Sequence, residues 1–333
     1  MNSKNEIWII DFYSPSWHVP EVKNAWQQEI LDFIQYYLNH DEIPVQTSGS
    51  TGTPKKYSLP KAAMQQSAAL TAEFLGLKNG DSAMLCMPVS YIAGKMMIVR
   101  AIEIGLKLIC VEPKARIQYY GAIEFCALTP MQAEASLDLL KQEFQISKLI
   151  LGGAKVSEYL EEQLKPLNTD IYETYGMTET ITHIAMRKLN EQQYFHVLKD
   201  IQIKQNEQNC LVIKTPYFSD EIVTNDIVHI MNDSNFKIIG RVDNIINSGG
   251  LKINPEELEQ KLKSYIQQPF IIHSKPDNTL GQKVILLIES EKAIPVDYPK
   301  DLIPKNKQPK EILFISKFPR SESGKIQRKK IEL

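Results

Sequence analysis

The sequence is poor in cysteine, nearly neutral and free of long apolar runs. Its four cysteines form no C-x-x-C pair, which argues against a zinc site and fits a reduced, cytoplasmic protein. Its 38 basic and 40 acidic residues give a net charge of −2, so no general attraction to nucleic acid or anionic membrane is expected. No apolar stretch approaches the roughly 18 residues of a membrane span, and the amino terminus lacks the order of a signal peptide. We therefore expect neither a membrane-spanning nor a secreted protein.

The 333 residues, of which 43% are hydrophobic, are enough for two domains with sizeable cores. Helical patterns alternate with short strand patterns as far as about residue 195, which is typical of an α/β sheet covered by helices. Strand-rich segments then predict a small β subdomain, and a third section begins near Arg241. Helices are expected over 20–38, 61–75, 95–104, 132–144, 157–167 and 254–266, the last with Asn254 as its cap.

A stretch rich in hydroxyl groups and glycine, "TSGSTGTPKKY", begins at Thr47. Glycines let backbone N–H groups approach a ligand, hydroxyls add donors, and lysine adds positive charge, so this composition suits a phosphate. The spacing differs from the usual P-loop because Pro54 stands where that motif has glycine. A flexible surface linker would have a similar composition, and both interpretations stay open from this stretch alone.

Three later segments carry further candidate residues, and each has a structural alternative. "YETYGMTET" (172–180) offers an aromatic ring and a Thr-Glu pair, but a carboxylate there could simply favour a helix start. "TND" (224–226) and "GRVDNIINSGGLKI" (240–253) offer two carboxylates, an arginine and a glycine pair that could form a tight turn. "PRSESGKIQRKK" (319–330) places Lys325 after a glycine, in what could be a solvated run of charge.

These segments, in this order, resemble the acyl-adenylate-forming enzymes, which include acyl-CoA synthetases and adenylation domains. The resemblance implies an ATP-dependent reaction in two steps. A carboxylic acid first forms an acyl-AMP and pyrophosphate, and a thiol, here coenzyme A, then takes the acyl group. The expected ligands are therefore ATP, Mg²⁺, coenzyme A and a small carboxylic acid. The oligomeric state stays open, a homodimer being one option.

The resemblance also assigns roles to individual residues. In the phosphate loop they are Thr47, Ser48, Gly49, Ser50, Thr51, Gly52 and Lys55. Gly153, Ala154 and Tyr175 would frame the adenine, Thr178 would touch the α-phosphate, and Glu179 would hold Mg²⁺. Asp226 and Arg241 would contact ribose and phosphate, and Gly249 and Gly250 would line the pantetheine tunnel. Lys325 would stabilise the adenylation transition state, where negative charge builds on phosphorus.

The same resemblance predicts the domain organisation. Residues 1–241 would form an ATP- and acyl-binding domain, and 242–333 a smaller, mobile α+β domain that carries Lys325 and rotates about Asp243. Members of the family usually have well over a hundred residues before the hydroxyl-rich loop, whereas 46 precede it here. A shortened large domain with helix-covered sheets is therefore expected. Many relatives also have histidine where this chain has Tyr91, so a role for Tyr91 in the acyl pocket does not follow automatically.

Within the family, "YGMTET" and "SYIAGKMMIVRAI" most resemble the ligases that activate o-succinylbenzoate for menaquinone biosynthesis. The second segment contains Arg100, which could pair with a second carboxylate because an unpaired buried charge is costly. It could equally be a surface or interdomain residue. Lys95 and His183 are further candidates. Another aryl- or acyl-CoA ligase, a stand-alone amino-acid adenylating enzyme and a non-catalytic nucleotide-binding regulator remain alternatives.

Overall fold

The computed structural model describes residues 7–46, 56–320 and 326–333. The chain divides into two compact units. The first comprises the chain up to residue 202 together with 214–222, and the second comprises 203–213 together with 223–333. The predicted functional boundary between residues 241 and 242 concerns movement, and it stays a prediction.

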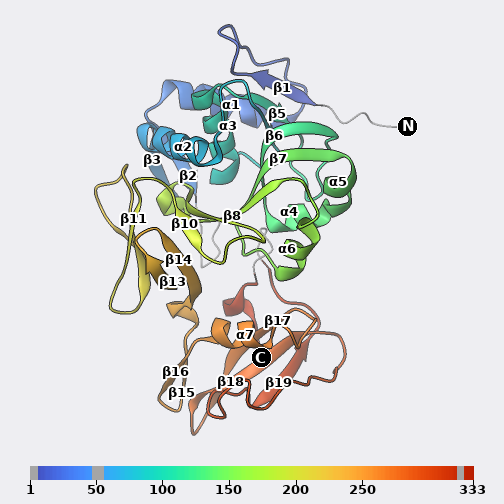
Figure 1. Cartoon of the computed structure of the whole chain (residues 1–333), viewed down its shortest axis with the longest axis vertical. Coiled ribbons are helices and arrows are strands. Elements are labelled where there is room, and N and C mark those ends of the chain that lie inside the picture. Colours follow the sequence, from blue (N-terminus) through green and yellow to red (C-terminus); the bar gives the residue numbers. More distant parts are fainter. Residues whose placement is uncertain (1–6, 47–55, 321–325) are drawn as a thin grey trace. The chain divides into compact units, whose positions relative to one another are not determined.

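The first unit is built on a mixed sheet whose strands lie in the order β1-β5-β4-β6-β7-β8-β9-β10 (Figure 1). Neighbours from β5 to β8 are parallel, whereas β1, β9 and β10 run antiparallel to their neighbours. The bounds are β1 Trp8–Asp11, β4 Ser82–Leu85, β5 Lys107–Cys110, β6 Gly121–Leu128, β7 Phe144–Leu151, β8 Asp170–Gly176, β9 His183–Lys188 and β10 Phe195–Val197. Strands β4 and β5 are apolar and buried after their first residue, as burial on both faces requires, whereas β8 alternates between buried and less buried residues. Their carboxyl ends lie at one edge of the sheet, where ligands of α/β proteins commonly bind.

Helices accompany this sheet, and their bounds test the predicted ranges. The structure has α1 Ala25–Asn39, α2 Lys61–Leu75, α3 Ile92–Ile104, α4 Pro130–Ala135, α5 Leu137–Gln142 and α6 Glu158–Leu164. The prediction for 61–75 is confirmed, and Gly76 ends α2 with a left-handed φ of +64°. None of the helices in the described ranges is long and apolar enough to cross a membrane.

Two of the differences between the predicted and the observed helices have identifiable local reasons. The prediction that Pro20 opens a helix was wrong, because α1 begins at Ala25 and the Asn24 N–H donates to Gln27 Oε1 at 3.0 Å. The range 132–144 is broken at Ser136, whose φ of −117° and ψ of 14° depart from helical values. Its hydroxyl oxygen instead accepts a hydrogen bond from the Ile117 N–H at 3.0 Å. A hydrogen bond between the Ser136 side chain and the backbone of another segment thus accompanies the break in a helix that the apolar pattern favours.

A separate two-stranded ribbon flanks the hydroxyl-rich stretch. Strands β2 Glu42–Gln46 and β3 Lys56–Pro60 are antiparallel, and Gln46 lies opposite Lys56. The residues on either side of the 47–55 segment, Gln46 and Lys56, are therefore held side by side.

The second unit contains the strands expected after residue 195. One set lies in the order β14-β13-β12-β11, and a five-stranded sheet has the order β16-β15-β18-β17 with β19 beside β18. The bounds are β11 Gln202–Gln205, β12 Cys210–Lys214, β13 Ile222–Asn232, β14 Asn235–Arg241, β15 Ile246–Ser248, β16 Leu251–Ile253, β17 Phe270–Asp277, β18 Gly281–Glu289, β19 Glu311–Ile315 and α7 Pro255–Leu262. Asn254 caps α7 as predicted, since its Oδ1 accepts from the Glu256 N–H at 3.1 Å.

Candidate functional site

The predicted phosphate loop and the catalytic lysine lie outside the described residues; they are Thr47, Ser48, Gly49, Ser50, Thr51, Gly52, Lys55 and Lys325. The first residues of β3 are described, and they lie beside another predicted part of the site. Burial, and then the nearby Glu179 carboxylate, raise the pKa of Tyr57, while a contact with the Thr178 hydroxyl acts in the opposite direction. The fold therefore brings the ribbon next to the Thr178–Glu179 pair.

Thr178 and Glu179 lie in a short 3-10 turn, η1 (Thr178–Thr180), that follows β8. The cap is made by the Thr180 hydroxyl, which accepts from the Met177 N–H at 3.0 Å. Glu179 is exposed, and no ion pair joins it to any residue of the described ranges. Its carboxylate oxygens are thus available to a cation such as Mg²⁺, which prefers oxygen ligands.

The predicted adenine residues lie on two neighbouring elements of the first unit. Gly153 and Ala154 follow β7, and Gly153 has a left-handed φ of +84°. Tyr175 is on β8, which pairs in parallel with β7, and its side chain is only 8% exposed. The sheet register thus supplies a common edge for the loop and the tyrosine.

Asp226, Arg241 and Asp243 form a charged group in the second unit. Asp226 on β13 lies directly opposite Arg241 on β14, and the Arg241 Nη1 is 3.1 Å from Asp226 Oδ1. The Nη2 atom is 3.1 Å from Asp243 Oδ2, and Asn225 Nδ2 donates to both Asp243 oxygens at 3.3 Å. One guanidinium therefore bridges the predicted ribose-binding carboxylate and the predicted hinge carboxylate.

The glycine pair Gly249–Gly250 forms the two-residue turn between β15 and β16. Both residues have positive φ, +56° and +82°, and Ser248 lies opposite Leu251. A non-glycine residue would be strained at either position. The structural alternative for this pair is thus confirmed, and its place in a pantetheine tunnel stays a prediction.

Arg100 is the most unusual charged side chain of the first unit. It lies on α3 and is only 2% exposed, so it is not a surface residue. Its Nε atom is buried without a hydrogen-bond partner, and no ion pair joins it to a carboxylate within the described ranges. Burial lowers the pKa of Arg100 to about 9, which still leaves it charged at neutral pH. A buried cation without an acid is costly unless a ligand compensates it.

A chain of neutral groups contacts the Arg100 guanidinium. Arg100 Nη2 donates to Thr182 Oγ1 at 3.3 Å, and Thr182 Oγ1 lies 3.3 Å from His183 Nδ1. His183 Nε2 is 3.0 Å from Thr71 Oγ1, which donates to the Ser67 carbonyl at 3.0 Å. With the Thr71 proton directed to Ser67, His183 carries its proton on Nε2 and accepts at Nδ1. Burial, and then Arg100, hold the pKa of His183 well below its usual value, so the imidazole is neutral.

The other predicted acyl-pocket residues occupy different positions. Tyr91 occupies the N-cap position of α3 without a side-chain capping bond, nine residues before Arg100 and thus roughly 13 Å along the helix axis. Lys95 places its Nζ 4.5 Å from the centre of the Phe33 ring, and burial lowers its pKa. Of the candidates for a second carboxylate, the structure therefore groups Arg100 with His183 and directs Lys95 to an aromatic ring.

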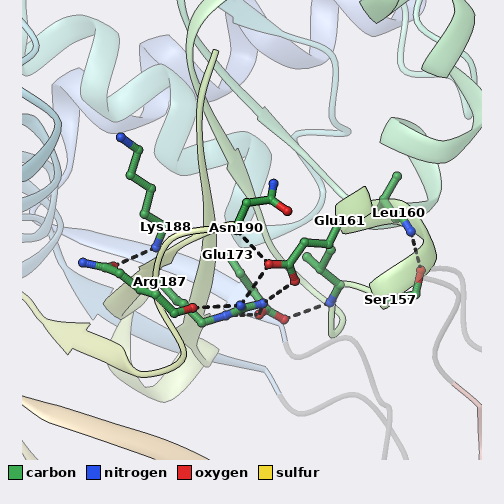
Figure 2. Close-up of polar contacts among 9 residues, drawn as sticks. Ser157, Leu160, Glu161, Glu173, Arg187, Lys188 and Asn190 are labelled. Carbon is green, nitrogen blue, oxygen red and sulfur yellow. Dashed lines mark hydrogen bonds and ion pairs between the residues drawn. The ribbon is translucent and has the colours of Figure 1, made fainter. Parts of the chain in front are cut away.

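Sequence reasoning missed an ionic network around Glu173, on β8 (Figure 2). Arg187 on β9 lies between Glu173 and Glu161, with Nη2 at 2.8 Å and 3.0 Å from their nearest oxygens. Glu173 also accepts a hydrogen bond from the Val156 N–H at 2.8 Å. The alternation along β8, which buries Glu173 on the same face as Tyr175, was the available signal.

Comparison with known proteins gives consistent results. Residues 45–204 match the family model described as AMP-binding enzyme. A 2-succinylbenzoate–CoA ligase of Bacillus cytotoxicus is 24% identical over 95% of this chain, which spans 75% of that protein. A structure titled acyl-CoA synthetase (AMP-forming)/AMP-acid ligase II-like protein, from Dyadobacter fermentans, is 31% identical with a TM-score of 0.65, covering 97% of this chain and 98% of its own. O-succinylbenzoate coenzyme A synthetase of Bacillus subtilis, in complex with ATP and magnesium ion, superposes with a TM-score of 0.71 at 19% identity, covering 86% and 69% of the two chains.

Proposed function

Because the chain belongs to the family of AMP-binding enzymes and is an AMP-forming acid–CoA ligase, we propose that its substrate is an acid with a second carboxylate, o-succinylbenzoate. The observation that carries this proposal is Arg100. It is a buried guanidinium whose hydrogen-bond partners in the described ranges are neutral, and its Nε has no partner. A carboxylate that does not react would supply the missing negative charge. The names of the curated relatives, which act on 2-succinylbenzoate, agree with this chemistry.

The reaction follows from the family. An oxygen of the reacting carboxylate attacks the α-phosphorus of ATP, the bond from that phosphorus to the oxygen bridging the α- and β-phosphates breaks, and acyl-AMP and pyrophosphate form. The sulfur of coenzyme A then attacks the acyl carbon, its proton is lost, and AMP leaves. Attack builds negative charge on the phosphoryl group, which fixed positive groups stabilise. Lys325 is proposed for this role in the first step.

The described residues are compatible with nucleotide and metal. Glu179 would hold Mg²⁺, whose charge neutralises phosphate oxygens. Thr178, one residue away, would donate its hydroxyl to the α-phosphate. Gly153, Ala154 and Tyr175 would enclose the adenine, and Asp226 would accept from the ribose hydroxyls. Moving the domain after residue 241 about Asp243 would then exchange Lys325 for the thiol.

A panel of acids tests the substrate. Pyrophosphate release by the wild-type chain should be fastest with o-succinylbenzoate and slower with 4-oxo-4-phenylbutanoate, which lacks the ring carboxylate. Arg100→Met should lower kcat/KM for o-succinylbenzoate by roughly 10- to 150-fold, as expected for a lost charge-assisted contact. The same substitution should leave kcat/KM for 4-oxo-4-phenylbutanoate nearly unchanged.

Arg116→Met is the matched control, because Arg116 is exposed and pairs with Asp138 on the surface. It should affect neither acid. Preference of the wild-type chain for fatty or amino acids would refute the proposed substrate. Equal losses with both acids in Arg100→Met would show that Arg100 does not recognise the second carboxylate. Binding of ATP without pyrophosphate release on any acid would instead favour a regulator.

A further inference from the structure

The loop that leaves β7, residues 152–156, is attached to β8 by two side chains. Thr174 Oγ1 donates to the Leu151 carbonyl at 3.1 Å, just before the loop. Glu173 Oε1 accepts from the Val156 N–H at 2.8 Å, at its end. Between these two attachments lie Gly153 and Ala154. The loop has no helix or strand of its own, so these contacts, together with the bond from the Gly152 N–H to the Leu128 carbonyl at 3.0 Å, help to fix where it lies.

Arg187 determines how Glu173 is oriented. Its Nε and Nη2 atoms donate to Glu173 Oε2 at 3.1 Å and 2.8 Å. The second oxygen, Oε1, is left for the Val156 N–H. The Glu173 carboxylate is thus divided, with one oxygen on the guanidinium and the other on the loop.

Arg187 is itself held from the opposite side, as Figure 2 shows. Glu161 on α6 accepts from Arg187 Nη1 at 3.3 Å and Nη2 at 3.0 Å, and the Gln192 carbonyl accepts from Nη1 at 3.1 Å. Glu161 Oε1 also accepts from the Asn190 N–H at 2.8 Å. All five donors of the guanidinium are therefore used, which gives Arg187 a single orientation.

The network is largely shielded from water. The side chains of Glu173 and Arg187 are 6% and 15% exposed. A buried carboxylate must keep its partners, because water cannot replace them at this depth. The hydrogen bond between Glu173 and the loop therefore depends on an ion pair whose separation would cost considerable free energy.

We propose that Glu173 and Arg187 are positioning residues that hold the Gly153–Ala154 segment at the edge of the purine base, and so determine affinity for adenine and discrimination against guanine. This inference rests on the proposed function, which gives the loop its nucleotide. Neither side chain needs to touch the base. Arg187 fixes the carboxylate, the carboxylate fixes the Val156 N–H, and the segment follows.

Glu173→Gln is the sharpest test because it preserves shape and removes one acceptor. A glutamine amide has one oxygen and one NH₂ group, so it cannot accept from Arg187 and from the Val156 N–H with different atoms. In one of the two contacts the glutamine NH₂ group then faces another N–H donor, from either Arg187 or Val156. The loop should then be displaced or loosened while the fold persists.

The measurement is equilibrium binding of ATP and of GTP to the full chain by calorimetry. We expect Glu173→Gln to weaken ATP binding by about 5- to 30-fold, corresponding to roughly 1 to 2 kcal/mol. Binding of GTP, which shares the triphosphate contacts, should change less than threefold, so discrimination falls. The ATP affinity of Arg187→Lys should lie between those of the wild type and Glu173→Gln. Lysine keeps the positive charge but lacks the planar set of donors with which arginine binds a carboxylate.

Glu161→Gln is the matched control, since Glu161 shares Arg187 but contacts no residue of the 152–156 loop in the described network. It should lower stability but change the ATP to GTP ratio less than Glu173→Gln does, because Glu173 keeps both of its oxygens and the glutamine oxygen can still accept from Arg187. Equal ratios in Glu173→Gln and Glu161→Gln would overturn the inference and leave a purely structural ion pair. Wild-type protein that binds no adenine nucleotide would overturn the proposed function as well. Acid selectivity should be unaffected by either variant, which separates this test from that of Arg100.

Discussion

Arg100, which is buried, and Arg187, which is partly buried, are two guanidinium groups of the same unit with opposite surroundings. Arg187 lies between two carboxylates and uses all its donors. Arg100 contacts a hydroxyl and a thioether sulfur, and its Nε has no partner. The first group is over-compensated by negative charge, and the second is not compensated by any described acid.

The difference separates two uses of the same side chain. A cation whose charge is satisfied inside the protein holds elements together, because removing it leaves carboxylates without a partner. A cation with neutral neighbours has already paid its desolvation cost, and an incoming anion gains the full attraction. The neutral state of His183 contributes to these uncharged surroundings of Arg100, since a charged imidazole would repel the guanidinium.

The largest expected effect is on stability when Arg187 is removed. Arg187→Met should lower the free energy of unfolding by about 3 kcal/mol, because Glu161 and Glu173 are left close together and partly buried. Urea denaturation followed by circular dichroism measures this. A loss below about 1 kcal/mol would mean that the network is no stronger than an exposed pair.

A smaller effect is expected at the far end of the hydrogen-bond chain that supports Arg100. Thr71→Val keeps the shape but leaves His183 Nε2 without its partner, which costs about 1 to 2 kcal/mol. The KM for o-succinylbenzoate should rise several-fold, with little change in KM for 4-oxo-4-phenylbutanoate. Thr71→Ser retains the hydroxyl and should restore the wild-type values. If Val and Ser behave alike, the chain does not position Arg100.

The acid side of the pH range distinguishes the two arginines by a still smaller effect. Burial raises the pKa of Glu161, but its contacts with Arg187 and Asn190 lower that pKa by more than burial raises it. The pKa of Glu161 therefore lies below its usual 4.5. Because the folded pKa is depressed, this group stabilises the fold above its unfolded pKa and loses that contribution as pH falls through the folded pKa. Glu161→Gln should therefore reduce the loss of stability between about pH 5 and pH 3, by up to about 1 kcal/mol. Arg100→Met should follow the wild-type profile, and a flattened profile in that variant would contradict the comparison.

The smallest change is expected in the stability of Arg100→Met at neutral pH. Methionine fills similar space and removes a buried charge without stranding a carboxylate, so the free energy of unfolding should change by less than about 1 kcal/mol. The same urea experiment, run beside Arg187→Met, gives the contrast directly. A loss as large as that of Arg187→Met would show that Arg100 is a structural residue.

The sequence by itself determined the features that depend on neighbours in the chain. Helix ends at Gly76 and Asn254 follow from local backbone and capping chemistry, and the turn at 249–250 follows from the ease with which two consecutive glycines adopt the positive φ angles found there. The order of the motifs also indicated the family. Local pattern was insufficient at Ser136, where a contact with Ile117 from a different segment divides a helix.

The tertiary structure alone decided the surroundings of each charge. Arg100 meets Thr182 from 82 positions away, and His183 meets Thr71 across 112 positions. Composition cannot reveal such pairings, because the energy of a charge depends on burial and on the few groups that the fold places within hydrogen-bond distance. For the same reason Arg187 and Glu173, 14 residues apart on adjacent strands, become an ion pair only once the sheet register brings them together.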